Sequence, residues 1–228
     1  MTAAAINTGH SPVQALMART AWIANQNDQE PLRTAGTVIH VAADREIFAE
    51  GGGTDSFYKV ISGVVRVCKF LSDGRRQIEA FHIAGEMFGF ELGEERLLSA
   101  EAVSECTLVS YRRHNVEQIA QRSESVSHQL LQFAMHNLAQ ARDHSLLLGR
   151  RGAAEKVAGF ILNWARRCLS EGAVHLAMSR QDMADYLGLT IETVSRSLSQ
   201  FEREGIIALP STRQLNVLDA RALQSLAA

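Results

Sequence analysis

The segment MSRQDMADYLGLTIETVSRSLSQFEREGII, residues 178–207, restricts the fold more than any other part of the chain. It reads as two short helices joined by a turn, with Ala184 where the helices would press together and Gly188 at the turn. Glycine adopts the positive φ of a tight turn without steric cost. Val194 follows six residues later, where it would pack the second helix onto the first. This spacing predicts a helix-turn-helix.

Capping residues stand at the ends of both predicted helices. Ser179 and Asp182 form a start that resembles a capping box, with the acid one carbon shorter than the usual Glu. Thr190 is placed to cap the second helix and Gly205 to end it. The local sequence and the helix-turn-helix spacing therefore agree on where each helix begins and ends.

A projection of the second helix at ~100° per residue separates two faces. Val194, Leu198 and Phe201 lie on the face that must pack inward. The opposite face carries Glu192, Ser195, Arg196 and Ser199. Arginine can donate two hydrogen bonds to guanine O6 and N7, and glutamate can accept one from cytosine N4. Two interpretations follow: an ordinary i,i+4 ion pair on a solvated helix, or a base-reading pair in which Glu192 also holds the guanidinium of Arg196.

Side chains suited to phosphate contacts surround this face, and the N-terminus of a helix itself favours a phosphate. After the helix, GIIALPSTRQLNVLD (205–219) predicts two short strands around a turn at residues 210–212, which form a wing, and a short closing helix follows. The predicted phosphate contacts are Ser179, Arg180, Thr190, Thr193, Ser199 and Arg213.

Residues 36–110 have the pattern of a β-domain. Short β-type segments such as FYKVISG, VVRVCKFL and CTLVSYRR are separated by turn residues. Three glycines at 51–53 mark a loop. Ser62-Gly63 and Asp73-Gly74 lie between apolar segments, which is a hairpin signal. We therefore predict an antiparallel sandwich, barrel or roll over these residues.

From residue 115 to residue 148 the pattern becomes helical. Steps of three and four residues form a heptad seam, which consists of Ser127, Leu131, Ala134, Leu138, Ala141, Ser145 and Leu148. The seam fits a helix that lies on its own domain or a helix that pairs with its twin in a dimer. Gly149 and Gly152 interrupt it, so the predicted domains span residues 1–114, 115–149 and 150–228.

Composition bounds the class of protein without naming a partner. The net charge is −2; residues 142–228 hold 11 Lys+Arg and 9 Asp+Glu, and residues 1–141 hold 12 and 16. This asymmetry is far weaker than a polybasic nucleic-acid footprint. No apolar run approaches the ~20 residues that span a bilayer. Residues 11–27 predict a short amphipathic helix, and the N-terminus lacks the pattern of a secretory signal, so we expect a cytoplasmic protein.

The sequence shows none of the common motifs of enzymes or metal sites. The sequence contains no GxSxG, P-loop or HExxH motif, so we expect no enzyme. Cys68, Cys106 and Cys168 lack the spacing of a metal site, and we expect them to be small core residues.

These features together resemble the CRP/FNR superfamily of bacterial transcription regulators over nearly the whole chain. YLGLTIETVSRSLSQFEREGII is similar to the FNR side of that family, and IFAEGGGTDSFYKVISGVVRV, DGRRQIEAF and AGEMFGFE are similar to its FixK branch. The resemblance implies an α+β fold: an N-terminal antiparallel β-roll (a double-stranded β-helix or jelly roll, as in cyclic-nucleotide-binding domains), a long dimerisation helix and a C-terminal winged helix-turn-helix.

The resemblance also implies a function. Members are homodimers that bind double-stranded DNA at an inverted repeat and recruit or block RNA polymerase. By residue match, Glu192, Ser195 and Arg196 fall on the E-x-x-S-R base-reading positions of FNR-type proteins, and Ile191 lies beside them. A TTGA–N6–TCAA type operator is thus implied. The FixK branch implies an activator of genes for low-oxygen respiration or nitrogen fixation.

Departures from the family pattern bear on the signal. Residues 1–67 contain no cysteine, so the iron–sulfur cluster of FNR is not expected. Cyclic-AMP-binding members hold the nucleotide with Gly-Glu-Leu and Arg-Ser pairs. Here Phe90 stands at that Glu, and Leu97 follows Arg96. We therefore expect no cyclic nucleotide and no cofactor, with Arg96 as a surface charge. Some FixK relatives carry a cysteine where Ser179 stands, and a serine cannot be oxidised in that way.

Two further readings stay open. One is a CRP-like regulator that senses an unidentified small molecule in the roll. The other is an adaptor that uses the winged helix for a purpose other than DNA binding.

Overall fold

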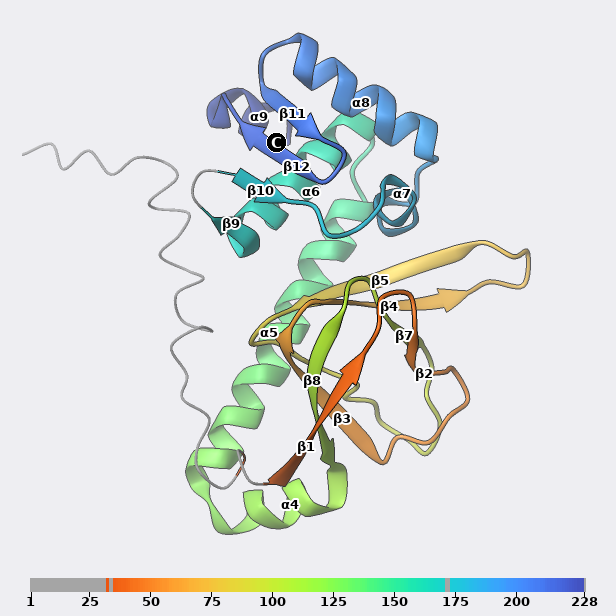
Figure 1. Ribbon diagram of the computed structural model, residues 1–228, viewed down its shortest axis with the longest axis vertical. Coiled ribbons are helices and arrows are strands. Elements are labelled where there is room, and N and C mark those ends of the chain that lie inside the picture. The colour runs from red at the N-terminus through yellow and green to blue at the C-terminus, as the bar shows by residue number, and fades with distance from the viewer. Residues whose placement is uncertain (1–31, 33–34, 171–172, 228) are drawn as a thin grey trace, which may run out of the picture.

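The computed structural model describes residue 32, residues 35–170 and residues 173–227. A β-roll forms the lower half in Figure 1 and a winged domain forms the upper half; the long helix α5 (Glu124–Leu148) runs from one to the other. This order confirms the predicted α+β fold. The helix predicted for residues 11–27 lies outside the described residues. In the part that is described, no helix has both the length and the apolar character needed to cross a membrane.

The β-roll consists of two four-stranded antiparallel sheets, with strand orders β1-β8-β3-β6 and β2-β7-β4-β5. Successive side chains of a strand point to opposite faces, and the inward ones, such as Val60, Val65 and Leu108, are fully buried. The strands are β1 (Gly36–Val41), β2 (Glu46–Phe48), β3 (Ser56–Ser62), β4 (Val64–Phe70), β5 (Arg76–Ile83), β6 (Met87–Phe88), β7 (Ser99–Ala102) and β8 (Cys106–Arg112).

The two predicted hairpins have different outcomes. Asp73-Gly74 forms the turn of the long β4–β5 hairpin, which projects to the right in Figure 1. Ser62-Gly63 is not a hairpin, because β3 and β4 belong to different sheets. It is a corner at which the chain crosses between the sheets. Gly63 has a φ of 90°, and a Cβ there would lie 2.4 Å from the carbonyl oxygen of Glu105, so the corner requires glycine.

The segment predicted as one helix over residues 115–149 is two helices, α4 (Arg113–Arg122) and α5. They separate at Ser123, whose backbone is extended and whose side chain accepts a hydrogen bond from the Val126 amide as the cap of α5. A serine inside a helical pattern looks like an ordinary polar residue, which is why the periodicity alone missed the break.

The heptad seam of α5 is exposed in the single chain. Leu131 and Leu138 are 59% and 43% exposed, and Leu148 is half-buried. The other seam residues, Ser127, Ala134, Ala141 and Ser145, are exposed. The helix packs on its own chain through the opposite side, where the buried residues are Val126, Gln129, His144 and Leu147. Its own domain therefore covers one side of α5 and leaves the seam open.

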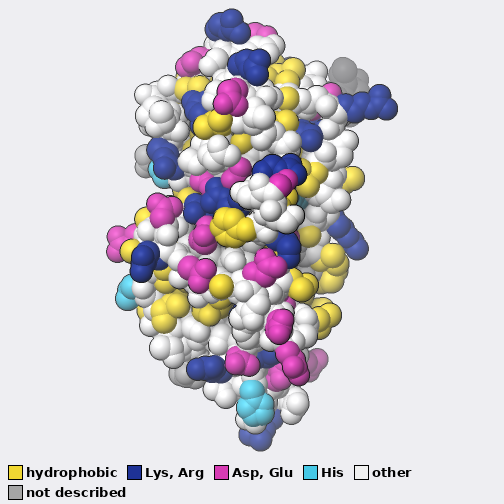
Figure 2. All heavy atoms as spheres, turned by 90° about the vertical axis from the view of Figure 1, so that its right-hand side faces the viewer, with side chains coloured by type: hydrophobic (Ala, Val, Ile, Leu, Met, Phe, Trp, Pro, Cys, Tyr) yellow, Lys and Arg dark blue, Asp and Glu magenta, His cyan; other side chains and the backbone are white. Residues whose placement is uncertain are grey.

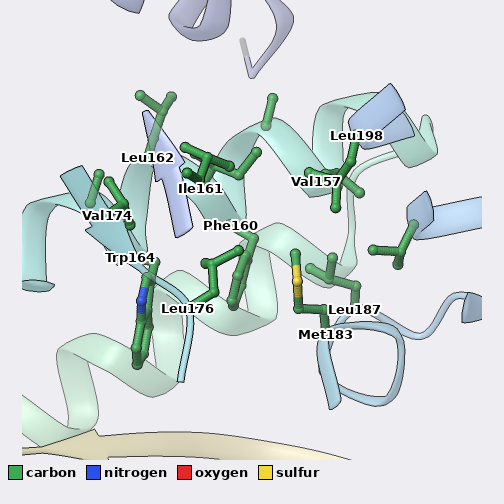
Figure 3. Packing of buried hydrophobic residues seen from close by; sticks show 14 of the residues in the cluster. Val157, Phe160, Ile161, Leu162, Trp164, Val174, Leu176, Met183, Leu187 and Leu198 are labelled. Atoms are coloured by element: carbon green, nitrogen blue, oxygen red, sulfur yellow. The ribbon is translucent and has the colours of Figure 1, made fainter. Parts of the chain in front are cut away.

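The winged domain is built around helix α6. Figure 3 shows Phe160, Ile161 and Trp164 of this helix pointing into an apolar core with Leu176 and Met183. The elements are α6 (Ala153–Cys168), β9 (Leu169–Ser170), β10 (Ala173–His175), α7 (Arg180–Leu187), α8 (Ile191–Arg203), β11 (Ile207–Ser211), β12 (Gln214–Val217) and α9 (Ala220–Leu226). Strands β9 and β10, which the sequence did not predict, extend the wing into a sheet of order β11-β12-β10-β9.

The turn of the wing lies later than predicted. Strand β11 includes Pro210 and Ser211, and the turn is formed by Thr212 and Arg213. Proline has no amide to donate, and strands accept it at edges and bulges. The β11–β12 register shifts between Ala208 and Ser211, which accommodates it.

A single apolar core crosses the junction between the two halves. Ile78 and Phe81 of the roll belong to the same buried cluster as Phe160 and Trp164 of α6. The Phe81 and Trp164 rings meet edge to face, with centroids 5.9 Å apart. The roll therefore contacts the winged domain through packed side chains as well as through α5.

Candidate nucleic-acid interface

Helix α7 begins with the predicted capping box. The Ser179 hydroxyl accepts a hydrogen bond from the Asp182 amide at 3.0 Å, and the Asp182 carboxylate accepts one from the Ser179 amide at 2.9 Å. Two amides that the helix leaves unbonded are thereby satisfied. The helix ends at Gly188, which has a φ of 62°. The first helix of the predicted helix-turn-helix is confirmed at both ends.

Helix α8 is capped and packed as the sequence indicates. The Thr190 side chain accepts a hydrogen bond from the Thr193 amide at 3.3 Å. Ala184 of α7 is fully buried, so the two helices approach closely. The inward face of α8 consists of Val194, Leu198 and Phe201, which are at most 1% exposed.

The opposite face of α8 is open to solvent. Glu192, Arg196 and Ser199 are exposed, Ser195 is half-buried and Ile191 is 38% exposed. The predicted base-reading residues thus share one face, on the N-terminal half of the helix. In Figure 1 this helix lies at the upper right, away from α5. The fold leaves this face free for a large partner.

The expected ion pair between Glu192 and Arg196 is absent from the described residues. Arg196 Nε instead donates to the backbone carbonyl of Glu192 at 3.4 Å. The Glu192 carboxylate turns to the helix N-terminus, where its own amide and then the Thr190 hydroxyl lower its pKa; Arg196 contributes less. Free amides at a helix start compete for a carboxylate. The Arg196 guanidinium therefore stands without a carboxylate partner in the described chain.

Three predicted phosphate contacts lie on α8 and its cap. Thr190 and Ser199 are exposed and Thr193 is half-buried. The hydroxyls of Thr190 and Thr193 are 3.1 Å apart, at the positive end of the helix dipole. The two hydroxyls and the helix start form one continuous polar edge.

The other three predicted phosphate contacts differ in how far their side chains are free to bind a phosphate. The Ser179 hydroxyl donates to Asp182 at 2.7 Å, so it is already engaged in the cap. Arg180 is half-buried at the first position of α7. Arg213 is exposed at the wing turn and donates to the carbonyl oxygen of Ala177. Of these three side chains, only Arg213 is exposed.

A charged cluster that no sequence motif predicts lies against α7. Arg66 and Arg76 of the β4–β5 hairpin reach Asp182 and Asp185 of α7. The partners are more than 100 residues apart along the chain, and no local motif relates them. Only the fold brings them together.

Arg96 is a buried residue and not the surface charge that was expected. It is 2% exposed, and its guanidinium carbon lies 3.8 Å from the centroid of the Phe48 ring. It donates to the carbonyl oxygens of Gly89, at 3.0 Å, and Ser56. Glu91 lies 3.6 Å away. The prediction was wrong because backbone carbonyls, which no sequence pattern reveals, are the main partners of this arginine.

A second buried charge, Glu86, lies where the roll, α5 and α6 meet. It is 1% exposed and accepts hydrogen bonds from Arg167 at 2.8 Å and from Gln140 at 3.0 Å. Burial alone would raise the pKa of Glu86, but Arg167, with His136 and His82, holds it well below its ordinary value. Nearby is a cavity of about 220 Å³. Phe90, on its lining, stacks on Phe57 with ring centroids 4.7 Å apart.

Two family models match the chain. The cyclic nucleotide-binding domain covers residues 38–123, which form the roll and α4. The Crp-like helix-turn-helix domain covers residues 155–226, which form most of the winged domain. Together they account for both halves of the fold.

Curated relatives and solved structures agree with these matches. The nitrogen fixation regulation protein FixK of Azorhizobium caulinodans is 47% identical over 84% of this chain and 79% of its own length. The FixK of Bradyrhizobium diazoefficiens is 40% identical over 92% and 91%. The structure of FixK2 from Bradyrhizobium japonicum is 41% identical, covers 85% of this chain and 98% of its own, and superposes with a TM-score of 0.81. The chain therefore belongs to the CRP/FNR family of DNA-binding transcription regulators, in its FixK-like branch.

Proposed function

We propose that this protein is a homodimeric activator that reads TTGA–N6–TCAA-like inverted repeats through α8. One observation carries the proposal: the exposed face of α8 presents Arg196 with no carboxylate partner in the described residues. An arginine free of ion pairs on the outer face of a second helix-turn-helix helix is suited to reach a base edge in the major groove. A TTGA half-site holds a single G·C pair, which suits one reading arginine.

Glu192 and Ser195 complete the reading surface. The lowered pKa keeps Glu192 ionised, so it can accept a hydrogen bond from cytosine N4 on the other strand. Thr190 and Thr193 lie at the helix start, where a backbone phosphate is favoured. Arg180, Ser199 and Arg213 would add phosphate contacts, and the engaged Ser179 would act mainly by holding α7.

The dimer would form through the seam of α5. Leu131 and Leu138 are exposed there, and the small Ala134 between them allows a second helix to approach. Two four-base half-sites with six bases between them have centres about 10 base pairs apart, which is one turn of DNA. Two recognition helices related by a two-fold axis can then enter successive major grooves on the same side of the duplex.

We infer that the protein acts without a cyclic nucleotide or other cofactor. In the roll, Arg96 is held by Phe48 and by backbone carbonyls, so it is not available to a phosphate. Phe90 packs on Phe57 and offers no acceptor for a ribose hydroxyl. The cavity of about 220 Å³ is smaller than the ~300 Å³ lower bound of common ligand sites. The same cavity, together with a pocket of about 640 Å³ lined in part by Thr54 and Gly93 of the roll, favours the alternative, a regulator with a small effector.

The relatives suggest which genes are controlled. FixK proteins are named for the regulation of nitrogen fixation, and a 33% identical relative is the transcriptional activator FnrL of Cereibacter sphaeroides. We propose that this protein activates genes of nitrogen fixation or low-oxygen respiration by recruiting RNA polymerase. A genome-wide map of bound promoters would test this part.

The base-reading role is tested by a gel shift of the Arg196→Ala variant on a TTGA–N6–TCAA duplex. We expect the free energy of binding to weaken by ~1–3 kcal/mol per lost contact and discrimination at the guanine to relax. Arg203→Ala is a matched control, because Arg203 makes the same 3.4 Å contact to the carbonyl four residues before it but lies at the far end of α8. Equal losses in both variants, with base preference intact, would contradict the proposal.

The same gel shift distinguishes this proposal from the alternative of a regulator that needs a small effector. Binding by the purified protein should need no added nucleotide, and cyclic AMP should leave the affinity unchanged. A requirement for any small molecule would favour the effector-sensing reading instead.

A further inference from the structure

We propose that Arg66 and Arg76 of the β-roll are positioning residues: they fix the orientation of the helix-turn-helix and thereby set the spacing between half-sites that the dimer accepts. The spacing part of this statement rests on the proposed function. The orientation part rests on the contacts between the roll and α7 alone.

The contacts are direct and shielded from solvent. Arg76 binds Asp185 through Nε at 2.9 Å and Nη2 at 2.8 Å, and Nη2 also binds Asp182. Arg66 lies 3.4 Å from Asp182 and binds Glu101 of the roll at 2.7 Å. These side chains are 6–18% exposed. Figure 2, which faces the β4–β5 hairpin side, shows basic and acidic side chains gathered near mid-height, where the halves meet.

Such a cluster is better suited to specify geometry than to add stability. Buried ion pairs lose about as much in desolvation as they gain in attraction, yet they are satisfied in only one arrangement. Guanidinium groups sharpen this effect because their donors have fixed directions. Asp182 is also the acidic member of the capping box with Ser179, so the hairpin contacts α7 within its first turn.

A second contact prevents rotation about the first. On α6, Arg167 reaches Glu86 of the roll at 2.8 Å, and the Phe81 ring of the roll packs against Trp164 of α6 and Tyr186 of α7. Two attachments on different helices define an orientation that one attachment leaves free. Because α7 and α8 pack closely through Ala184, the direction of the recognition helix follows that of α7.

Orientation translates into operator spacing. Adding two base pairs between half-sites moves one of them by about 7 Å and rotates it by about 70° around the duplex. A firmly held helix-turn-helix cannot follow this displacement, whereas a loosely held one can follow it in part. The preference of the protein for one half-site spacing therefore reports how rigidly the roll holds α7. Its preference for particular bases does not.

The test compares affinities for TTGA half-sites separated by six and by eight base pairs. In Arg76→Gln we expect the preference for six over eight to fall about tenfold, within the usual range of coupling between sites. Asp185→Asn should give part of this fall, because it leaves the contact between Arg76 and Asp182 in place. The double variant should fall no further than Arg76→Gln, which already removes the contact with Asp185. Arg76→Lys keeps the charge and should keep most of the preference. If Arg76→Gln does not fold, Asp185→Asn carries the test.

Arg75→Gln is the matched control. Arg75 is the neighbouring arginine of the same hairpin, its side chain is 77% exposed, and it pairs with Asp73 of its own turn. Its loss removes the same charge without touching α7, so the spacing preference should stay as in the wild type. A fall as large as that in Arg76→Gln would show a general charge effect and overturn the proposal.

Orientation is also measurable without DNA. Spin labels at Thr37→Cys on β1 and Gln200→Cys on α8, with labelled chains diluted in unlabelled protein, report the distance between the halves. Both positions are exposed. Cys68 and Cys106 are buried, and burial raises the pKa of Cys168 to about 11, which suppresses labelling there. We expect a narrow distance distribution in the wild type and in Arg75→Gln, and a broad one in Arg76→Gln.

The outcomes separate the two proposals. Unchanged spacing preference together with a narrow distribution in Arg76→Gln would overturn the positioning role. If the wild type ignores TTGA half-sites, the proposed operator fails, and the label distances alone decide whether the roll holds α7.

Discussion

Gly63, at the corner between β3 and β4, has less room for a side chain than Gly74 in the β4–β5 turn. A Cβ at Gly63 would meet the Glu105 carbonyl oxygen at 2.4 Å, whereas a Cβ at Gly74 would meet nothing within 4 Å. Both residues have positive φ, which costs an alanine about 1–2 kcal/mol. In Gly63→Ala a clash adds about 1–3 kcal/mol. We expect urea unfolding to show a clearly larger loss for Gly63→Ala than for Gly74→Ala. Equal losses would mean that the corner relaxes freely.

Single residues also show what the sequence can and cannot predict. Glycine serves a hairpin turn and a sheet-to-sheet corner equally well, so the sequence could not tell Gly63 from Gly74. Arg96 was misplaced for a related reason, since its carbonyl partners carry no side-chain signature. The cap of Ser179 and Asp182 was predicted in full, because both partners lie within one turn of chain.

Among the elements, α5 is the helix through which the proposed dimer would form. Its seam is exposed in the single chain, and we expect Leu138→Glu to convert the proposed dimer to a monomer, because a charge in an apolar seam loses its hydration. Ala139→Glu is the control: Ala139 is also exposed but lies ~100° around the helix, outside the seam. Sedimentation at matched concentrations measures the result. A dimeric Leu138→Glu would place the interface elsewhere.

Elements with local signals were predicted well, and those without were not. Both helices of the helix-turn-helix follow from caps, a turn glycine and a 3.6-residue period. The break at Ser123, strands β9 and β10 and the turn after Ser211 depend on pairing with distant strands or on packing. The roll–α7 cluster of Arg66 and Arg76 has no local signal at all, because it exists only once both halves are folded.

For the whole molecule, Glu86 ties stability to pH. Its pKa is well below its ordinary value of 4.5, because Arg167 and two histidines outweigh the opposing effect of burial. A carboxyl with a lower pKa in the folded state binds fewer protons there than in the unfolded state. Its contribution is therefore complete above about pH 4.5 and is lost as the pH falls through the folded pKa.

Urea unfolding of the wild type and of Glu86→Gln, measured from neutral pH to below about pH 4.5, tests this role of Glu86. At neutral pH the variant should lose about 3–5 kcal/mol, because Arg167 stays buried without its partner. The difference between the two proteins should shrink as the pH drops below about 4.5. Glu117→Gln is the control, since Glu117 is exposed and pairs with the half-buried Arg113, and its substitution should cost less than about 1 kcal/mol. A difference that does not vary with pH would contradict the assignment.

The core that crosses the junction bears on how such regulators can diversify. A winged domain grafted from another protein would have to present a surface that fits Phe81, and one cut out alone would expose the parts of Phe160 and Trp164 that Phe81 covers. Exchange of whole domains therefore disturbs the packing at the junction unless this surface is kept. If α8 reads DNA as proposed, substitution on its outer face disturbs none of this packing, so new DNA preferences can arise there one side chain at a time.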